Sequence, residues 1–278
     1  MNLLVVLALS TLPLGQAAPL GGTQEPDAAR KAALEEVLKD AKTYEIVLDG
    51  GAPARLDLHP QSILNWSSAE RNDENGGIFV WMKDGRPEVI GAIWSLYRKA
   101  SDQVVWRHGL QSLSQHPVTA RFESKTIWAP RKPGVEFNPV EDAEAPSDSA
   151  QRRLVQMRNL AREFKVEIDE QTGVTSQLRL LTQPILRYEP TTGPGKDGAI
   201  FALNAGTDPD VLLLLEAREA AGKLRWEVAF GRLHFVALRA FRRDTKVWSV
   251  ERDLENRRHA FGADPGRDKI YYSVVRPR

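Results

Sequence analysis

Apolar residues follow two different spacings along this chain, and each spacing predicts one kind of element. In two segments they recur every three or four residues, which marks one buried face of a helix. We therefore expect helices over about 28–42, capped by Asp27, and over about 150–164. The first stripe consists of Leu34, Val37, Leu38 and Ala41, and the second of Leu154, Met157, Ala161 and Phe164.

Short apolar runs between turn-forming residues predict antiparallel strands in the rest of the chain. The run Val211–Leu215 has no polar alternation, so we expect a central strand that is buried on both faces. In the first half the predicted strands are 44–48, 54–58, 63–66, 78–82, 88–97, 103–113, 118–122 and 126–128. In the second half they are 165–169, 176–181, 185–188, 200–204, 210–217, 224–233, 236–242 and 246–250, with 270–275 as a further candidate.

Two distant stretches resemble each other. Gly76–Ile93 reads GGIFVWMKDGRPEVIGAI, and Gly198–Leu215 reads GAIFALNAGTDPDVLLLL. At a nearly constant offset, Trp106 and Trp128 match Trp226 and Trp248. Chance similarity of two amphipathic patterns is the alternative, but bulky Trp residues in register favour a repeat. The predicted fold is therefore α+β: a tandem duplication in which each unit is one helix followed by about six to eight antiparallel strands, forming a curved sheet or a half-barrel.

This interpretation divides the chain into four segments. Residues 1–17 hold an apolar run and small residues suited to signal-peptide cleavage, so we expect export to the periplasm or the exterior. The first α+β unit covers 18–130, and the second unit, with a C-terminal strand, covers 149–278. Between them, 131–148 is a Pro-rich acidic linker. Its cluster Glu141, Asp142 and Glu144 suits a cation site or simply a solvated linker, and the second is favoured.

The amino-acid composition excludes several classes of partner and site. Lys and Arg total 38 against 37 Asp and Glu, a balance that argues against nucleic acid as a partner. The chain has no cysteine, which excludes disulfides, thiol nucleophiles and thiolate metal sites. Beyond the signal peptide, no run is long and apolar enough to span a membrane.

A search for catalytic, cofactor and metal motifs yields no site residue. The five histidines are not at metal-ligand spacing, and no GxSxG elbow is present. These histidines are His59, His108, His116, His234 and His259. We therefore assign no catalytic residue, no cofactor and no metal ligand.

Polar pairs that match between the two halves are better explained by structure. Asp49 with Asp169, and Glu88 with Asp210, suit turns and strand ends. Gln61 and Gln183 each precede an apolar strand, so a buried amide bonded to the main chain is expected.

A basic cluster in the second half suits either an anion or envelope-surface patch or a solvated Arg-rich face, and the solvated face is favoured. The cluster comprises Arg239, Arg242, Arg243, Lys246, Arg252, Arg257, Arg258 and Arg267.

The passages DGAIFALNAGTDPDVLLLLEA and LRLLTQPILRYEP, together with the signal peptide, resemble exported uncharacterised proteins of planctomycete-type bacteria. The resemblance covers most of the second half. It implies export and a bacterial origin, and it implies no activity and no site residues.

Three functions remain open. The first is a non-catalytic exported binding or interaction protein, with a protein or an apolar ligand as partner. The second is an envelope carrier of an apolar ligand such as a lipid, which a large apolar pocket would favour. The third is a hydrolase with dispersed residues, which requires a cleft where His108 or His234 meets a carboxylate. The lack of motifs leaves enzymatic activity uncertain, with the balance against it.

Overall fold

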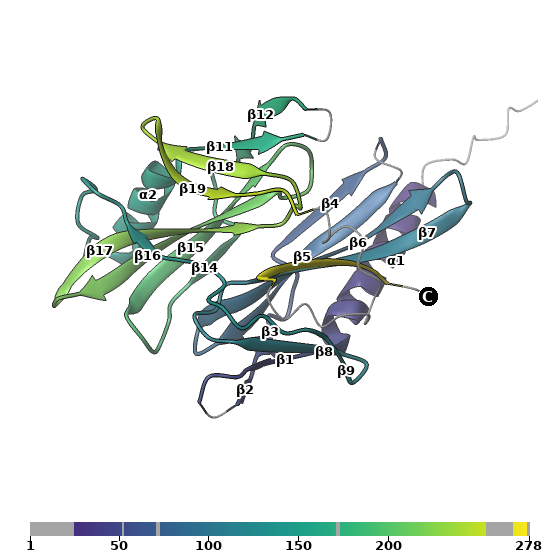
Figure 1. The fold of residues 1–278 in the computed structure, drawn as a ribbon, viewed down its shortest axis with the longest axis horizontal. Helices are drawn as coiled ribbons and strands as arrows, with labels where there is room; N and C mark the ends of the chain where they lie inside the picture. The colour runs from purple at the N-terminus through teal and green to yellow at the C-terminus, as the bar shows by residue number, and fades with distance from the viewer. Residues whose placement is uncertain (1–24, 52, 71–72, 171–172, 254–268, 277–278) are drawn as a thin grey trace, which may run out of the picture.

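The computed structural model describes residues 25–51, 53–70, 73–170, 173–253 and 269–276. The predicted signal peptide, residues 1–17, lies outside the described residues. Two helices and twenty strands make up the described part of the chain (Figure 1). The helices are α1 (Glu25–Thr43) and α2 (Ala150–Ala161), and the side chain of Ser149 caps α2 by accepting from the N–H of Arg152. Phe164, expected at the end of the second helix, instead begins a strand.

The predicted α+β class is wrong. Strands occupy 52% of the chain and helices only 12%, so the fold is mostly antiparallel β and is not a duplicated helix-plus-strands α+β unit. The physical reason is that the helices do not form a layer of their own. Helix α1 packs on only two strands of one large sheet, and α2 packs on two strands of another.

Four antiparallel sheets form the fold. Two small outer sheets have the orders β2-β1-β8-β9 and β12-β11-β18-β19. The strands of the first outer sheet are β1 (Tyr44–Leu48), β2 (Ala54–Arg55), β8 (Val118–Phe122) and β9 (Lys125–Trp128). Those of the second are β11 (Phe164–Asp169), β12 (Thr175–Gln177), β18 (Leu238–Arg242) and β19 (Thr245–Val250).

Two larger inner sheets have the orders β20-β7-β6-β5-β3 and β10-β17-β16-β15-β13, with β4 also on β5 and β14 also on β15. The first inner sheet contains β3 (Asp57–Leu58), β4 (Leu64–Ser68), β5 (Glu74–Lys83), β6 (Arg86–Arg98), β7 (Gln103–Ser112) and β20 (Tyr271–Arg276). The second contains β10 (Asn138–Pro139), β13 (Arg179–Leu180), β14 (Leu186–Tyr188), β15 (Gly195–Asn204), β16 (Val211–Ala220) and β17 (Lys223–Arg232). Strands at the same place in these orders are called corresponding strands below, for example β7 and β17.

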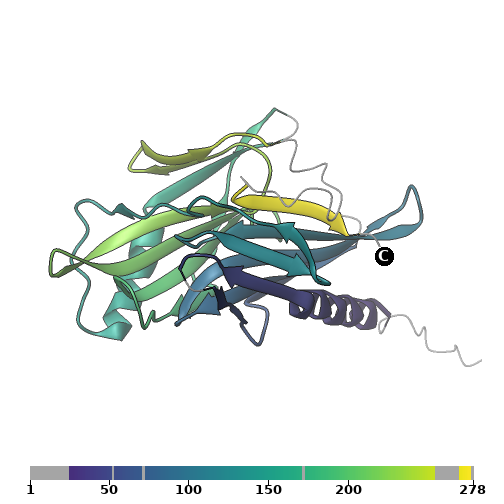
Figure 2. The same cartoon turned by 60° about the horizontal axis from the view of Figure 1, so that its bottom comes forward.

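The edge strands of the inner sheets are exchanged between the two halves. Strand β10 follows the first half in sequence but pairs with β17 of the second half. Strand β20 follows the second half but pairs with β7 of the first half. Figure 2 shows β20, in yellow, lying with the strands of the first half. Part of the expected linker, residues 131–148, is thus hydrogen-bonded into the second inner sheet.

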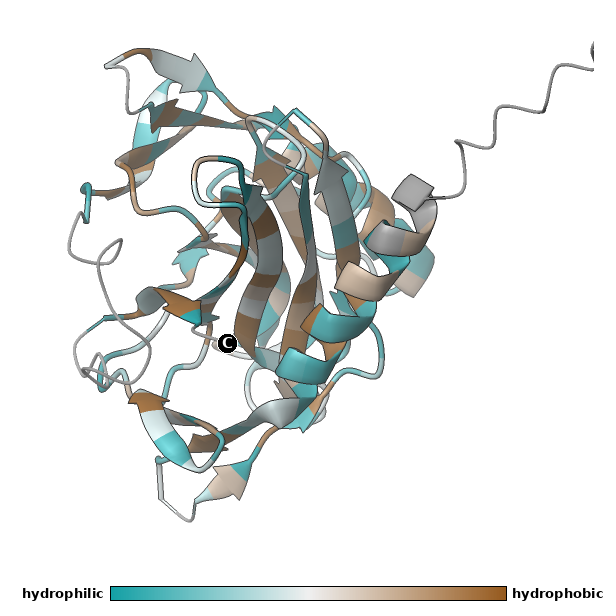
Figure 3. Cartoon of the chain, turned by 90° about the vertical axis from the view of Figure 1, so that its right-hand side faces the viewer, coloured by the Kyte–Doolittle hydropathy of each residue, from teal (hydrophilic) through white to brown (hydrophobic). Residues whose placement is uncertain are grey.

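Each inner sheet buries both of its faces, because successive side chains of a strand point to opposite sides. On β16, Leu212 and Leu214 belong to a central cluster between the two inner sheets, whereas Leu213 faces α2 and the second outer sheet. On β5, Val80 faces the central cluster and Trp81 faces α1 and the first outer sheet. Figure 3 shows the resulting apolar bands along the strands. All of Val211–Leu215 is 0% exposed, which confirms the predicted central strand.

Replacing Leu214 by Ala tests the central cluster. The side chain is fully buried between the inner sheets, so we expect a loss of about 2–5 kcal/mol in the free energy of unfolding, measured by urea denaturation. Val155→Ala is the control, since Val155 is exposed on α2 and should change stability by less than about 0.5 kcal/mol. Equal effects of the two substitutions would contradict the packing described here.

Candidate functional site

A large pocket opens where the second half is less completely covered than the first. It has a volume of about 920 Å³ and lies between residues 133–142 and strand β17 on one side and the β18–β19 hairpin on the other. We call it the seam pocket. Three aromatic rings form its floor. The rings of Phe230 and Trp248 stack with their centroids 5.3 Å apart, and the rings of Phe164 and Phe230 meet edge to face with their centroids 5.7 Å apart.

The seam pocket exists because β10 is short. In the first half, β20 pairs with six consecutive residues of β7, and its Tyr272 and Val274 fill the core beside Trp128. In the second half, β10 pairs with only Val228 and Glu227 of β17. The side chain that occupies the place of Val274 there is Asn138, which is exposed and lines the pocket.

Two arginines close the two ends of the seam. Arg232 of β17 donates from Nη1 to the carbonyl of Glu251, just beyond β19, at 3.0 Å. Arg242 of β18 donates from Nη1 to the carbonyl of Glu141, just beyond β10. These contacts tie the edge of one sheet to the edge of the other and leave the pocket between them.

Arg232 is held among main-chain oxygens. Besides the Glu251 carbonyl, it donates to the carbonyls of His234 at 2.7 Å and Val236 at 2.9 Å. Arg232 is 7% exposed, and burial lowers the pKa of its guanidinium from the ordinary value. Among the described residues it forms no ion pair within 4 Å, so the end of the pocket holds a buried positive charge stabilised by dipoles.

Two further buried polar atoms lie at the pocket. The side chain of Gln111 donates to the carbonyls of Ser112 and Gly134, but its Oε1 has no hydrogen-bond partner among the described residues. Arg242 Nη2 lies 2.9 Å from Glu163 Oε2, yet it is buried without a well-directed hydrogen bond in that same part of the chain. Both atoms are sealed from solvent, so they lie behind the lining of the pocket and do not face its open space.

The charges around the seam pocket balance. Three guanidinium groups and three carboxylates line it. They are Arg232, Arg242 and Arg243, and Glu136, Glu141 and Asp142. Glu163, behind the lining, also pairs with Arg242 and Arg243, so the positive charges at the pocket are largely compensated.

A buried His–carboxylate pair occurs in the first half, at the position that corresponds to the seam pocket. His108 Nε2 lies 3.0 Å from Asp40 Oδ2, and its Nδ1 lies 2.7 Å from the hydroxyl of Tyr44. Arg276 of β20 bonds the other oxygen of Asp40. His108 is 0% exposed and Asp40 is 2% exposed, so this group lies inside the core formed by the described residues.

Electrostatics fix the state of this buried group. Burial alone would raise the pKa of Asp40, but the bonds and charges of His108 and Arg276 outweigh it and hold the pKa below 3.8. Burial also raises the pKa of the Tyr44 phenol well above its usual range. The group ties α1 to β7 and β20 as a charged, hydrogen-bonded network.

The other histidines lie apart from one another and from the seam pocket. His59 bonds the carbonyl of Gln61, His116 lies against Gly50, and His234 stacks on Phe235 at 4.5 Å. His259 lies outside the described residues. No group of three potential metal ligands occurs within the described ranges.

The matched polar pairs serve the fold, with one correction. Asp49 bonds Arg131 and Thr119, Asp169 bonds Arg239 and Thr175, and Asp210 accepts from the N–H of Ala205. The expected buried amides are wrong, because Gln61 and Gln183 are both exposed.

The described members of the basic cluster are largely paired with acidic groups. Arg239 bonds Asp169, Arg242 and Arg243 both meet Glu163, and Arg252 donates to the carbonyl of Glu170. Arg257, Arg258 and Arg267 lie outside the described residues.

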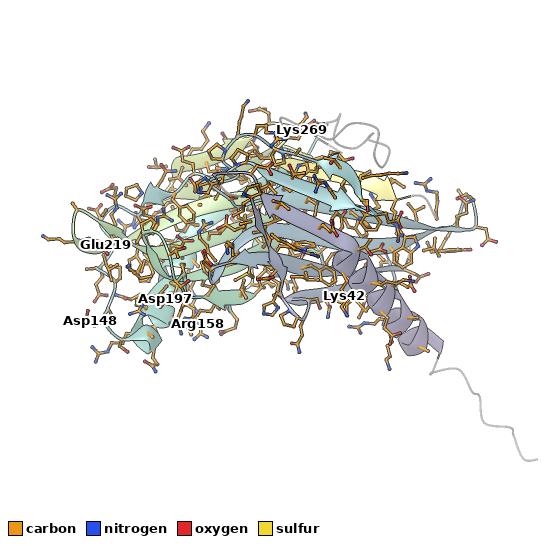
Figure 4. All side chains as sticks on the ribbon, turned by 90° about the horizontal axis from the view of Figure 1, so that it is seen from below. Lys42, Asp148, Arg158, Asp197, Glu219 and Lys269 are labelled. Atoms are coloured by element: carbon orange, nitrogen blue, oxygen red, sulfur yellow. The ribbon has the colours of Figure 1, made fainter. Side chains whose placement is uncertain are left out.

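Elsewhere in the second half, Asp197 is similarly bonded by Arg153 and Arg187 beside α2 (Figure 4).

A second buried ionic group joins the two inner sheets. Arg86 of β6 meets Glu88 at 3.1 Å and Glu216 of β16 at 3.3 Å, and Arg218 bonds Glu216 at 2.6 Å. The ring of Phe137 lies under both arginines, with Arg218 4.4 Å from its centroid. All of these charges are paired, and the contact of Arg86 with Glu216 links β6 of one inner sheet to β16 of the other.

A smaller cavity of about 220 Å³ also lies between the halves, beside Trp66, Trp94 and Tyr271. Its volume falls below the usual range of ligand pockets, so the seam pocket is the better candidate site.

No helix in the described ranges has the length and apolar character needed to cross a membrane. Comparisons with protein families, curated proteins and solved structures find no match to this chain.

The sequence contains only an indirect sign of the seam pocket. Where the other half has the apolar Val274, residues 131–148 carry the polar Asn138. That difference becomes informative only when β10 and β20 are known to occupy corresponding places.

Replacing Asp40 by Asn tests the buried His108 network through its pH dependence. A carboxyl with a lowered pKa in the folded protein stabilises it above the unfolded value, and this stabilisation is lost as pH falls through the folded value. The difference in free energy of unfolding between wild type and Asp40→Asn should thus shrink as pH falls below about 3.8. Urea denaturation at a series of pH values measures it.

Glu144→Gln is the matched control, because Glu144 is exposed. Its difference from wild type should stay small throughout the series. If the difference for Asp40→Asn does not change with pH, the ionised carboxylate of Asp40 does not stabilise the folded protein.

Proposed function

We propose that this protein is an exported, non-catalytic binding protein that holds an apolar, uncharged ligand in the seam pocket. The observation that carries the proposal is the contrast between the halves: β20 closes the core of the first half, whereas the corresponding place in the second half is an open pocket with an aromatic floor. A pocket of about 920 Å³ falls within the range typical of ligand sites.

The lining supports a ligand of this kind. Phe164, Phe230 and Trp248 offer apolar surface whose burial would drive binding. The balance of three cations and three carboxylates favours an uncharged molecule over a fatty acid or an anionic headgroup.

Other features argue against a hydrolase. Where a histidine meets a carboxylate, at His108 and Asp40, both groups are sealed in the core, and the partner on the other ring nitrogen is a tyrosine hydroxyl. Among the described residues the seam pocket contains no histidine. Export is proposed from the signal-like pattern of residues 1–17.

Binding of the neutral apolar dye Nile red tests the site. We expect saturable binding with increased dye fluorescence, and a dissociation constant at least about tenfold weaker for Asn138→Trp, because the new ring would fill space that the dye needs. Val104→Trp is the matched control. It adds the same ring at an exposed position at the start of β7 that does not line the pocket, and it should bind as wild type does.

Both variants are checked for folding by circular dichroism before titration. Equal binding by wild type and Asn138→Trp would place the dye elsewhere and reject the seam pocket as the site. Native mass spectrometry of the purified protein gives an independent test, since a mass released from wild type and lost from Asn138→Trp would identify the natural ligand.

A further inference from the structure

Two open sheet edges face the seam pocket. Strand β17 is the nearly uncovered edge of the second inner sheet, and β19 is the edge of the second outer sheet. We propose that the ligand of this pocket is a short extended polypeptide segment of a partner protein, which lies in the seam and pairs with both edges. This inference rests on the proposed function and names the chemical class of its ligand.

The edge of β17 has main-chain groups free to bond. The N–H of Val140 donates to the carbonyl of Trp226, so the main-chain groups of Trp226, Val228 and Phe230 all point to the β10 side. Strand β10 ends its pairing at Val228. No hydrogen bond to the main chain of Phe230 from that side occurs among the described residues.

The edge of β19 offers a second row. The N–H of Asp169 donates to the carbonyl of Ala237, which fixes the alternation along β18 and directs its Leu238 and Ala240 to β19. Their partners on β19 are Val250 and Trp248, so the main chain of Ser249 points outward to the seam. Within the described ranges it too has no hydrogen-bond partner.

In the first half, a strand fills the place that corresponds to the seam pocket. There β20, which comes from elsewhere in the chain, pairs along β7 and places alternate side chains, Tyr272 and Val274, into the core beside Trp128. A segment in the seam pocket would likewise place alternate apolar side chains on Phe230 and Trp248. Added strands of this kind gain affinity from main-chain bonds and specificity from side-chain pockets.

The arginine contacts at both ends limit the length of the segment. Arg232 and Arg242 cross the seam, so only residues between them lie in the pocket. On β19, residues 245–250 lie between the two arginines. A bulge near Val247 interrupts the regular pairing at one end of this stretch. The paired part of the segment is therefore about four residues, and its flanks leave the seam. Because the lining charges balance, the paired residues are uncharged.

A peptide titration followed by NMR tests this proposal on the full chain. The probe is the capped peptide KIYYSVVR, the sequence of Lys269–Arg276, because this strand fills the corresponding place in the first half. We expect saturable binding and amide exchange at Phe230 and Ser249 slowed by about tenfold or more. The same peptide with alternate main-chain nitrogens methylated keeps its side chains but loses donors, and it should bind about tenfold more weakly. Asn138→Trp should abolish binding, and Val104→Trp should retain it.

The outcomes separate this inference from the function on which it rests. Equal affinity of the plain and methylated peptides would overturn strand pairing and leave a side-chain pocket. Chemical-shift changes centred on the paired strands β7 and β20, in place of changes at Phe230 and Ser249, would mean that the peptide displaces β20, which also overturns the proposal. Binding of Nile red without binding of the peptide rejects a polypeptide ligand while the proposed function stands, and failure of both probes rejects both.

Discussion

The packing of the two inner sheets against each other determines the rest of this structure. Each inner sheet contributes one apolar face to the central cluster, so its opposite face must be buried by something else. A helix and a four-stranded outer sheet cover that opposite face in each half. The charges of Arg86, Glu216 and Arg218 are tolerated between the sheets because each one is paired, and the contact of Arg86 with Glu216 links one sheet to the other.

The candidate site follows from a difference between two halves with the same order of strands. One edge strand is six residues long and brings aromatic and aliphatic side chains into the core, and the other is two residues long and brings Asn138. Where the first half holds a closed polar network around His108, the second half has Val228 and open space. A fold can keep its packing while one edge strand decides whether a core position is filled or accessible.

Local patterns in the sequence predicted much of the fold. The unbroken apolar run Val211–Leu215 identified a strand buried on both faces, and the stripe at Leu34 and Ala41 identified α1. The class was wrong because periodicity describes single elements and does not weigh helices against sheets. The ligand pocket and the pairing of β20 with β7 could not be predicted, since both depend on contacts between residues far apart in sequence, where no local pattern acts.

The exchange of edge strands has a consequence for synthesis. Asp40 of α1 bonds Arg276, which is 236 residues later in the chain. At the usual rates of translation, roughly ten to fifty seconds separate the two residues on the ribosome. From the completion of β7 until β20 is made, within that time, the edge of β7 has no partner strand and His108 lacks the cover of Val274. The nascent first half therefore exposes an unpaired, aggregation-prone β edge until β20 has been synthesised. A prematurely terminated product would keep that edge exposed.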